Sequence, residues 1–546
     1  MTVAGQIKKG AYFDSVTLMR VGRELAGLPG VADAAVVMGT KSNRAILHSS
    51  GLLAPQFSGA GDTDLLIAVK AGSAKAARAA LAAAEGLLGQ AGRNTATGAE
   101  VRPAGLEGAL QVLPGANLAL ISVAGRYAGD VAMRALEHGL HVMLFSDNVP
   151  LAQEVALKRF ARKRELLVMG PDCGTAIISG VPLAFANAVN RGGIGIVAAA
   201  GTGLQEVSCL ISNAGAGISQ AIGTGGRDVK QPVGGIMFVE ALKALAADEQ
   251  TKVILLVSKP PDPQARQRIE RVMKTVRKPV VTLFIGAPRR GAGPATLEEA
   301  ALQAVALAQG RKPERVTAEL AARDEGLREL AQRQAARRTK GRKYVRGLFS
   351  GGTFCAEAQI ILRDMLPASR QPAQAVALYS NVPVHGVKQL RDSLASQGHT
   401  LIDLGEDEFT VGRPHPMIDY TLRNRRILEE AADPATALIL LDVVLGYGAH
   451  PDPGAELAPV LRRAAQKVAV VCSVTGTDRD PQNRSRVAAA LRKAGAIVMP
   501  SNAAACKLTG QIIQCLSGAK CRGVSSLSGG QELDGTGRSI AYEQHN

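Results

Sequence analysis

Tryptophan is absent from this 546-residue chain, and aromatic residues make up only 3% of it. Proteins that bind single-stranded nucleic acid stack bases on exposed aromatic rings, so this composition argues against that class. The seven cysteines include no CxxC pair and no zinc-type spacing. No apolar run approaches the roughly 18 residues of a membrane span, and the N-terminus lacks a signal pattern. We therefore expect a cytoplasmic protein with reduced thiols and no metal site, whose partners include neither nucleic acid nor a membrane.

Two nucleotide-binding motifs are also missing. No GxxxxGK[ST] sequence occurs, which excludes a P-loop. Residues 193–198 formally fit GxGxxA, but these glycines come before or begin the strand, whereas a dinucleotide fingerprint follows its strand. NAD is therefore not expected.

Positive charge is present in excess, with a formal net charge of +17. Much of it lies in residues 311–346, which hold twelve Lys and Arg against five Asp and Glu. Charge runs of this kind are usually solvated helices, so we interpret the segment as a linker rather than a nucleic-acid patch. The remaining positive balance suits anionic small-molecule substrates.

Strand and helix patterns alternate along most of the chain, which predicts an α/β protein with parallel sheets. In one stretch, apolar strands are expected at 194–200, 218–222, 252–257 and 279–284, with helices between them. A later stretch repeats this order, and the N-terminal part is typical of a small ferredoxin-like layer. The expected units are the small α/β domain 1–95, a parallel-sheet domain 96–190, two similar units 191–310 and 347–515, the basic helical linker 311–346, and a mobile tail 516–546.

The feature around which the chain is organised is a strand, a tight turn and a helix, with Gly201, Thr202 and Gly203 at the turn. Gly352 and Thr353 follow another apolar run in the same way. Free backbone N–H groups and the positive end of the helix dipole converge at such a start, which suits phosphate. One such turn would be an ordinary glycine turn that starts a helix, but two in equivalent places favour a pair of anion sites. If the two copies face one another, both helices point at one phosphoryl group.

Five further side chains are candidates for catalysis or substrate binding. Glu206 and Glu357 lie four residues after each threonine, where they either stabilise the helix N-terminus or orient a catalytic group. Arg227 and Arg413 are candidates for holding a substrate carboxylate through two parallel hydrogen bonds, and exposed surface arginines are the alternative. His450 ends a strand, where it is either an acid/base group or a solvent-facing loop residue.

Residues 170–173, the strand that runs into Gly201 and Thr202, and residues 223–228 together resemble the alpha subunit of succinyl-CoA synthetase. The second copy resembles the carboxyl-terminal ligase domain of the beta subunit of that enzyme. The resemblance implies a Rossmann-like domain of the CoA-binding type, followed by two flavodoxin-like ligase domains. It also implies that the two helix starts are power helices that hold a phosphohistidine and carry the glutamates matching Glu206 and Glu357.

Two departures from this family are large. Residues 286–294 contain no histidine where the family carries its phosphorylated one, and nothing in the chain resembles the ATP-grasp domain. The first strand-and-glycine loop of the CoA domain also lacks a counterpart. ATP-driven acyl-CoA synthesis by this chain alone is therefore not expected; no cofactor is required by the residues, and CoA stays open.

Over nearly its whole length the chain resembles FdrA-type proteins, the fused acyl-CoA-synthetase-like family. The resemblance implies the large subunit of a catabolic oxamate carbamoyltransferase that works with two other subunit types in anaerobic allantoin breakdown. Oxalurate and phosphate would give oxamate and carbamoyl phosphate, with phosphate bound between the helix starts. Two alternatives remain: the CoA-binding subunit of an NDP-forming acyl-CoA-synthetase-like enzyme, which is an acid–thiol ligase, and a non-catalytic metabolite-sensing scaffold.

Overall fold

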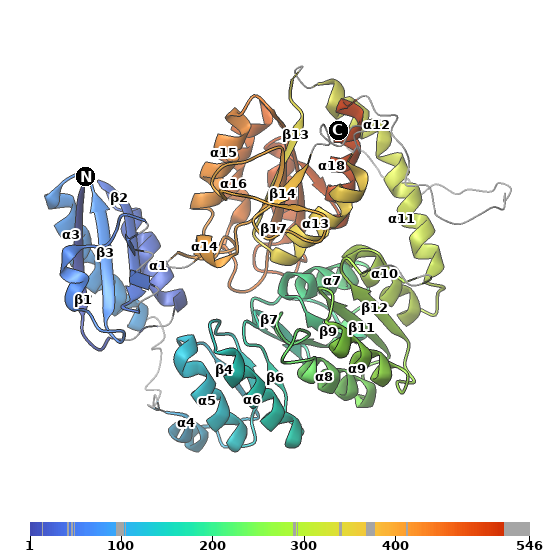
Figure 1. Ribbon diagram of the computed structural model, residues 1–546, viewed down its shortest axis with the longest axis horizontal. Helices are drawn as coiled ribbons and strands as arrows, with labels where there is room; N and C mark the ends of the chain where they lie inside the picture. The colour runs from blue at the N-terminus through green and yellow to red at the C-terminus, as the bar shows by residue number, and fades with distance from the viewer. Residues whose placement is uncertain are drawn as a thin grey trace.

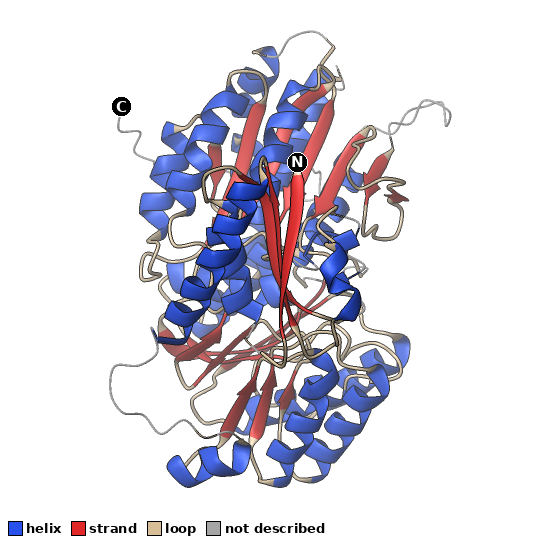
Figure 2. Cartoon of the chain, turned by 90° about the vertical axis from the view of Figure 1, so that its left-hand side faces the viewer, coloured by secondary structure: helices blue, strands red, loops and turns tan. Residues whose placement is uncertain are grey.

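The computed structural model describes residues 1–517, apart from residues 12, 14, 41–42, 45–46, 49, 94–102, 104, 288–290, 292, 338–340, 367–376 and 411–412. The predicted tail therefore lies almost wholly outside the described residues. Within the described residues the strands form four sheets, and the N-terminal one (blue) stands apart from the other three in Figure 1. Turned by 90°, it lies in front of the junction between the larger sheets (Figure 2). No helix in the described part of the chain is long and apolar enough to cross a membrane.

The N-terminal unit is a three-stranded antiparallel sheet in the order β1-β3-β2. Alternate residues of β3 point to opposite faces: Leu65 and Ile67 pack against the helices, while Leu66 and Ala68 pack against a loop segment that carries Phe57. The sequence predicts β2 and misses β1, whose central Gly5 packs under the Phe57 ring. The elements are β1 Thr2–Lys8, α1 Ser15–Ala26, β2 Val31–Met38, η1 Pro55–Gly59, β3 Leu65–Ala71 and α3 Ala74–Arg93.

A separate parallel sheet in the order β4-β5-β6 follows, with helices connecting its strands as the alternating pattern predicts. The next hairpin, β7–β8, pairs instead with β10 of the following sheet. Residues of the predicted range 96–190 are thus divided between two sheets, because a short hairpin carries no strand–helix alternation. The elements are α4 Leu106–Val112, β4 Leu118–Ile121, α5 Gly125–Glu137, β5 His141–Leu144, α6 Leu151–Lys163, β6 Val168–Met169, β7 Thr175–Ile178 and β8 Val181–Ala184.

The two larger sheets repeat one arrangement of parallel strands. The order β10-β9-β11-β12 in one sheet matches β16-β13-β17-β18 in the other, and each central strand, β9 or β13, leads directly into a helix, α7 or α13. The first set is β9 Arg191–Ala199, α7 Gly201–Asn213, β10 Ile218–Gly223, α8 Ile236–Ala247, β11 Val253–Ser258, α9 Pro263–Met273, β12 Val280–Phe284 and α10 Leu297–Ala308. The second set is β13 Tyr344–Phe349, α13 Gly352–Met365, β14 Leu378–Ser380, β15 Lys388–Gln389, β16 His399–Asp403, α14 Asp407–Thr410, α15 Thr421–Ala432, β17 Thr436–Val444, α16 Pro453–Ala465, β18 Ala469–Thr475, α17 Arg484–Lys493, β19 Ile497–Met499 and α18 Asn502–Leu516.

The basic segment 311–346 contains α11 (Glu314–Gly326) and α12 (Arg328–Ala336), and its last residues enter β13. Its charges are paired with both repeated units: Arg323 forms two hydrogen bonds with Glu298 of α10, and Asp324 binds Lys507 of α18 at 2.5 Å. The segment therefore joins the two units rather than lying free in solvent.

One buried apolar cluster passes from the first repeated unit into the second. It includes Val207 on α7, Leu297 on α10, Ala358 on α13 and Leu508 on α18. Because interiors of this kind are close-packed, the cluster fixes the two central helices against one another. Figure 1 shows α7 and α13 meeting where the green and yellow units join.

Candidate functional site

Helices α7 and α13 start at the carboxyl ends of equivalent strands, and their first turns touch. A β-carbon on Gly351 would lie 2.7 Å from Cγ2 of Thr202, and one on Gly203 would lie 3.0 Å from Cγ2 of Thr353. Each threonine thus packs against the backbone at the start of the opposite helix. Glycine is needed at Gly351, because a side chain there would overlap Thr202.

Donors at both helix starts are available to a ligand. The N-cap residues Ala200 and Gly351 make no side-chain capping bond. Thr202 is 9% exposed and Thr353 is 4% exposed, and neither hydroxyl has a hydrogen-bond partner within the described part of the chain. Neither hydroxyl oxygen is among the enclosed polar atoms that lack a partner, so both keep access to solvent. These two donors together with the helix dipoles suit an anion at this point. The approach is open on one side, because a β-carbon on Gly201 would meet nothing within 4 Å.

Hydrogen bonds to a buried carboxylate fix the turn that precedes α13. Asp442, buried on β17, accepts the backbone N–H groups of Ser350 at 2.8 Å and Gly351 at 3.0 Å. Its carboxylate also accepts the Ser350 hydroxyl at 2.9 Å and pairs with the buried Arg423 at 3.1 Å. The start of α13 is therefore positioned before any ligand binds, which is the condition for electrostatic preorganisation.

Two charged residues that sequence reasoning does not single out lie over the start of α13. Lys259 directly follows β11, and Asp403 is the last residue of β16. A β-carbon on Gly352 would lie 2.5 Å from Oδ2 of Asp403 and 3.9 Å from Nζ of Lys259. Burial raises the pKa of Asp403 to about 7, while the N–H of Gly405 and the charge of Lys259 oppose that rise. The signal in the sequence was their place at strand carboxyl ends, where parallel sheets collect ligands.

Glu206 and Glu357 are buried and lie one turn into the helices, where each carboxylate is bound on both oxygens. Glu206 accepts the backbone N–H of Asn502 at 3.0 Å and the hydroxyl of Thr475 at 2.5 Å. Glu357 accepts the backbone N–H of Leu297 at 2.7 Å and the side-chain amide of Asn502 at 2.8 Å. Each glutamate of one unit thus caps a helix of the other, α18 or α10. The observed contacts are those of structural caps.

Arg227 is half exposed and leans against α6. Its Nη2 lies 2.9 Å from Oε2 of Glu154 and donates to the carbonyl of Val149 at 2.9 Å. The fully buried Lys158 binds the other oxygen of Glu154 at 2.9 Å and Asp228 at 2.9 Å. This network fixes the bend that carries Arg227, whose outer face stays accessible to a substrate.

Arg227 and acidic side chains from several loops lie within electrostatic reach of Asp172. Burial, followed by the charge of Asp147, raises the pKa of Asp172 to about 6, and Arg227 opposes the rise. Asp407 and Glu406 of the second repeated unit add smaller repulsions. Loops at the carboxyl ends of all three parallel sheets therefore meet in one region.

The remaining two candidates lie elsewhere. Nε2 of His450 is 3.1 Å from a guanidinium nitrogen of Arg23 on α1, and its ring stacks on Tyr420 with centroids 5.2 Å apart. Burial, helped by Arg23, lowers the pKa of His450. Arg413 is exposed, and its described contact is a backbone bond to Thr410 at 3.0 Å. No described contact joins either residue to the paired helices.

The N-terminal unit reaches the start of α5 through one ion pair. Asp62 accepts from Arg126 at 2.5 Å through its carboxylate and at 2.8 Å through its carbonyl. Nε of Arg126 is buried without a partner among the described residues. An orphaned guanidinium nitrogen at the end of β4 is suited to an anionic group of a ligand.

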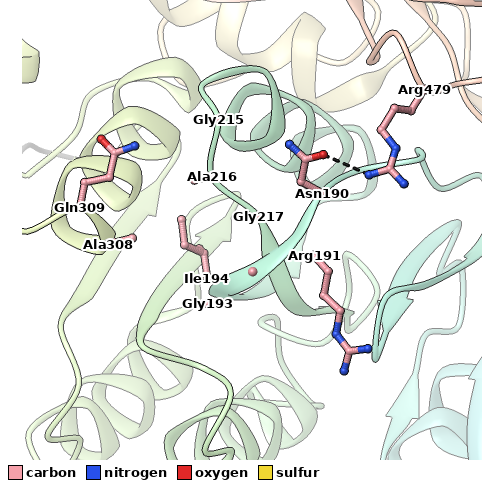
Figure 3. A pocket seen from close by; sticks show the side chains of 11 residues that line it. Asn190, Arg191, Gly193, Ile194, Gly215, Ala216, Gly217, Ala308, Gln309 and Arg479 are labelled. Carbon is pink, nitrogen blue, oxygen red and sulfur yellow. Dashed lines mark hydrogen bonds between the residues drawn. The ribbon is translucent and has the colours of Figure 1, made fainter.

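A cavity of about 580 Å³ opens at the opposite end of the first repeated unit, where β9 and β10 begin. Glycine backbone lines its floor, and Arg479 closes one side by donating to Asn190 at 3.1 Å (Figure 3). Because the paired helices start at the carboxyl end of β9, this cavity is separate from them.

Three family models match the chain. A CoA-ligase model matches residues 348–512, a CoA binding domain model matches residues 190–286, and a model described as AllF, heavy metal-associated domain, matches residues 1–103. The first two cover the repeated units that carry α13 and α7. The CoA binding match thus falls on the first repeated unit rather than on the β4–β6 sheet.

The chain is also similar to curated proteins and to solved structures. "Uncharacterized protein YahF" of Escherichia coli K12 is 39% identical over 92% of this chain and 97% of that protein. Subunit alpha 1 of the ADP-forming succinate–CoA ligase of Archaeoglobus fulgidus is 31% identical over 31% of this chain and 58% of that subunit. The solved dinucleotide forming acetyl-coenzyme A synthetase 1 of Ca. Korarchaeum cryptofilum is 14% identical, covering 73% of this chain and 83% of that chain with a TM-score of 0.27.

The predicted carbamoyltransferase is wrong on these findings. The models that match the repeated units are a CoA-ligase and a CoA binding domain, and the functionally named relatives are succinate–CoA ligase subunits. The oxamate, allantoin and transferase parts of the prediction are therefore unsupported as well. Paired helix starts that bind phosphate serve both chemistries, so the residues quoted for the resemblance could not separate the two. The alternative prediction, an acid–thiol ligase type of protein, agrees better.

The heavy-metal name of the N-terminal match does not fit the residues present. Soft metal ions need thiolate or imidazole ligands, and residues 1–103 hold no cysteine and a single histidine, His48. No cluster of three or more potential ligands occurs among the described residues. We derive no metal chemistry for this unit.

Proposed function

Because this chain belongs to the FdrA-type family of fused acyl-CoA-synthetase-like proteins, we propose that it is the CoA-binding subunit of an acid–thiol ligase-type enzyme. The paired starts of α7 and α13 would hold inorganic phosphate or the phosphoryl group of an acyl phosphate. The observation that carries this proposal is the pair of threonines, Thr202 and Thr353, whose hydroxyls have no partner among the described residues where two helix N-termini meet.

In the proposed reaction, inorganic phosphate cleaves the thioester of an acyl-CoA. A phosphate oxygen attacks the thioester carbon, the carbon–sulfur bond breaks, and acyl phosphate and the CoA thiolate result. Negative charge gathers on the phosphate and on the tetrahedral intermediate, so fixed donors at the helix starts lower its energy. Lys259, whose ammonium reaches the first residue of α13, supplies the nearest described positive charge at that point.

CoA would supply the thiol, and its phosphates would need a positive site near the junction of the sheets. The CoA binding model matches residues 190–286, and the guanidinium of Arg126, at the start of α5 in the neighbouring sheet, fits that need through the outer nitrogens that Asp62 contacts. Gly125 beside it leaves no spare room, since a β-carbon there would lie 2.1 Å from the carbonyl of Asp147. We therefore assign the phosphates to the outer side of Arg126, which Asp62 contacts.

Arg227 is proposed to hold the carboxylate of the acyl group, because half of its side chain is accessible beside the same loops. The nucleotide step is proposed to lie on a partner subunit. Phosphate, an acyl phosphate and such a partner are the molecules that we expect this chain to meet.

The test is phosphate-dependent release of the CoA thiol from acyl-CoA, followed with a thiol reagent, together with calorimetric titration of phosphate and CoA. We expect Thr202→Val and Thr353→Val each to weaken phosphate binding about tenfold, because a hydrogen bond to a charged ligand contributes about 1.5–3 kcal/mol. Thr282→Val on β12 is the matched control, since the hydrogen bond of that hydroxyl among the described residues is to the Met273 sulfur at 3.9 Å. Equal phosphate affinity in all four proteins would overturn the site. Phosphate binding without thiol release from any acyl-CoA would favour the metabolite-sensing scaffold.

A further inference from the structure

We propose that Asp403 is a phosphoryl acceptor, so that this chain passes through an aspartyl phosphate at the start of α13. The proposal rests on the proposed function for the kind of donor, an acyl phosphate. It concerns a residue that the proposed reaction between phosphate and acyl-CoA does not itself require.

Geometry places one carboxylate oxygen at the anion site. The backbone of Asp403 is fixed by Asn381, which accepts its N–H at 2.9 Å and donates to its carbonyl at 3.0 Å. Oδ1 accepts the N–H of Gly405 at 2.9 Å. Oδ2 has no hydrogen-bond partner among the described residues and lies over Gly352, the first residue of α13. The side chain is 3% exposed, so it is a buried nucleophile with one oxygen held and one free.

Positive charge converges on the same point. Nζ of Lys259 and Oδ2 of Asp403 both lie close to the position of a β-carbon on Gly352, at the helix end where the first N–H groups of α13 lack intrahelical partners. They would hold the oxygens of a phosphoryl group while Oδ2 approaches phosphorus. Aspartate carboxylates act as nucleophiles towards phosphorus in other enzymes, so the chemistry lies within the range of this side chain.

The step balances without a further reagent. Oδ2 of ionised Asp403 attacks the phosphorus of the acyl phosphate, and a phosphorus–oxygen bond to Asp403 forms. The bond between phosphorus and the acyl oxygen breaks, and the acyl group leaves as a carboxylate. One mixed anhydride replaces another, no proton is transferred, and nothing is oxidised or reduced. A partner that binds a nucleoside diphosphate would then accept the phosphoryl group.

Other nucleophiles near this point are less suited. His415 accepts the N–H of Met417 at Nδ1 at 3.2 Å, so the proton of the neutral ring lies on Nε2, the atom nearer Asp403. Burial raises the pKa of the Cys355 thiol, which keeps it protonated. Residues 286–294, where relatives are expected to carry a phosphohistidine, contain no histidine. The hydroxyls of Thr202 and Thr353 are weak nucleophiles without a base to activate them. Among the described carboxylates, Asp403 is the one whose free oxygen lies over Gly352.

The experiment incubates the full chain with ³²P-labelled acetyl phosphate and counts label that survives denaturation. We expect label that neutral hydroxylamine removes, as for an acyl phosphate. Asp403→Asn should carry none, and Asp364→Asn, at an exposed position near the far end of α13, should be labelled like the wild type. Reduction of the labelled wild type with borohydride should convert residue 403 to homoserine, which peptide mass spectrometry detects without any variant. Label retained by Asp403→Asn, or an unlabelled wild type, would overturn the proposal.

The dependence of the labelling rate on pH provides a second test of the proposal. Because burial raises the pKa of Asp403 to about 7, the ionised nucleophile becomes abundant only above that pH, and the labelling rate should rise between pH 6 and 8. The charged and titratable groups that face Asp403 are Lys259, Cys355, Glu406, His415 and Asp442. A rate that is flat or falls over this range would contradict an ionised Asp403 nucleophile.

Failure of this inference and failure of the proposed function can be told apart. If phosphate releases CoA thiol from acyl-CoA but acetyl phosphate leaves no label, the ligase-type function stands and the aspartyl phosphate falls. If label forms but no thiol is released, Asp403 is an acceptor in another reaction. If neither occurs, both proposals fail.

Discussion

Asn502 donates its backbone N–H to Glu206 at 3.0 Å, which ties the first residue of α18 to the inside of α7. Replacing Glu206 with Ala would leave this N–H and the hydroxyl of Thr475 unpaired in the interior. Each unpaired buried group costs about 1–3 kcal/mol, so we expect a loss of about 2–6 kcal/mol of unfolding free energy in urea titrations. Glu206→Gln keeps one acceptor oxygen and should lose far less. Equal losses in the two variants would contradict a capping role.

The same carboxyl makes stability depend on pH. Burial raises the pKa of Glu206 from 4.5 to about 7, so the folded state favours the protonated form. Its contribution is full below about pH 4.5 and is lost as the pH rises through 7. Relative to Glu206→Gln, which cannot ionise, the wild type should therefore become less stable between pH 6 and pH 8. Urea midpoints at both values measure this, and a constant difference between the two proteins would count against it.

Lys158 is the buried centre of the network that supports Arg227. Lys158→Met would leave the carboxylates of Glu154 and Asp228 without their buried cation, although Glu154 keeps Arg227 on one side. Removing one partner of a buried ion pair costs about 3–5 kcal/mol, and we expect a loss in that range by chemical denaturation. Lys163→Met, on an exposed position of the same helix, is the control and should change stability by less than about 0.5 kcal/mol. A wild-type-like Lys158→Met would mean that the network contributes little.

Gly201 and Gly351 allow the helix starts to be tested without changing charge. A β-carbon on Gly201 meets nothing within 4 Å, so Gly201→Ala should fold normally but project into the open side of the anion site. A β-carbon on Gly351 would lie 2.7 Å from Thr202, so Gly351→Ala should separate the two helices and lower the melting temperature. Thermal melts measure the stability of the two variants, and phosphate titrations measure their affinity for phosphate. Unchanged phosphate affinity in Gly201→Ala would place the anion elsewhere.

Much of the fold is predictable from local pattern. The expected strand 218–222 lies within β10, and the expected strand 279–284 exceeds β12 by one residue, because apolar runs between helices leave few other choices. The β7–β8 hairpin was missed, since it gains its place by pairing with β10, a partner in a later unit. The carbamoyltransferase was wrong for a different reason: helix starts that are suited to phosphate do not reveal what the phosphate would react with.

The candidate site likewise contains residues that the sequence predicts and residues that it does not. The two Gly-Thr turns are visible in the sequence because each is a local motif. Lys259 and Asp403 are not, since they belong to different units and meet only when the two sheets pack across α7 and α13. The capping role of Glu206 is also hidden in the sequence, because its partner Asn502 lies 296 residues away along the chain. The sequence left two interpretations of the glutamates, as residues favoured near the positive start of their own helix or as groups that orient catalysis. Their contacts show a different arrangement, in which each caps a helix of the other unit.

The ion pair between Asp62 and Arg126 offers a test of how the N-terminal unit acts on ligand binding. Asp62 occupies the guanidinium to which we assign the CoA phosphates, so Asp62→Ala should raise CoA affinity. The pair is partly exposed and contributes at most about 1 kcal/mol, which limits the gain to about fivefold. Glu107→Ala, which breaks the exposed pair with Arg134 on the same helix, is the matched control and should leave CoA affinity unchanged. Calorimetric titration of CoA into the three full-length proteins measures this. Weaker CoA binding by Asp62→Ala would show instead that docking of the N-terminal unit helps to build the CoA site.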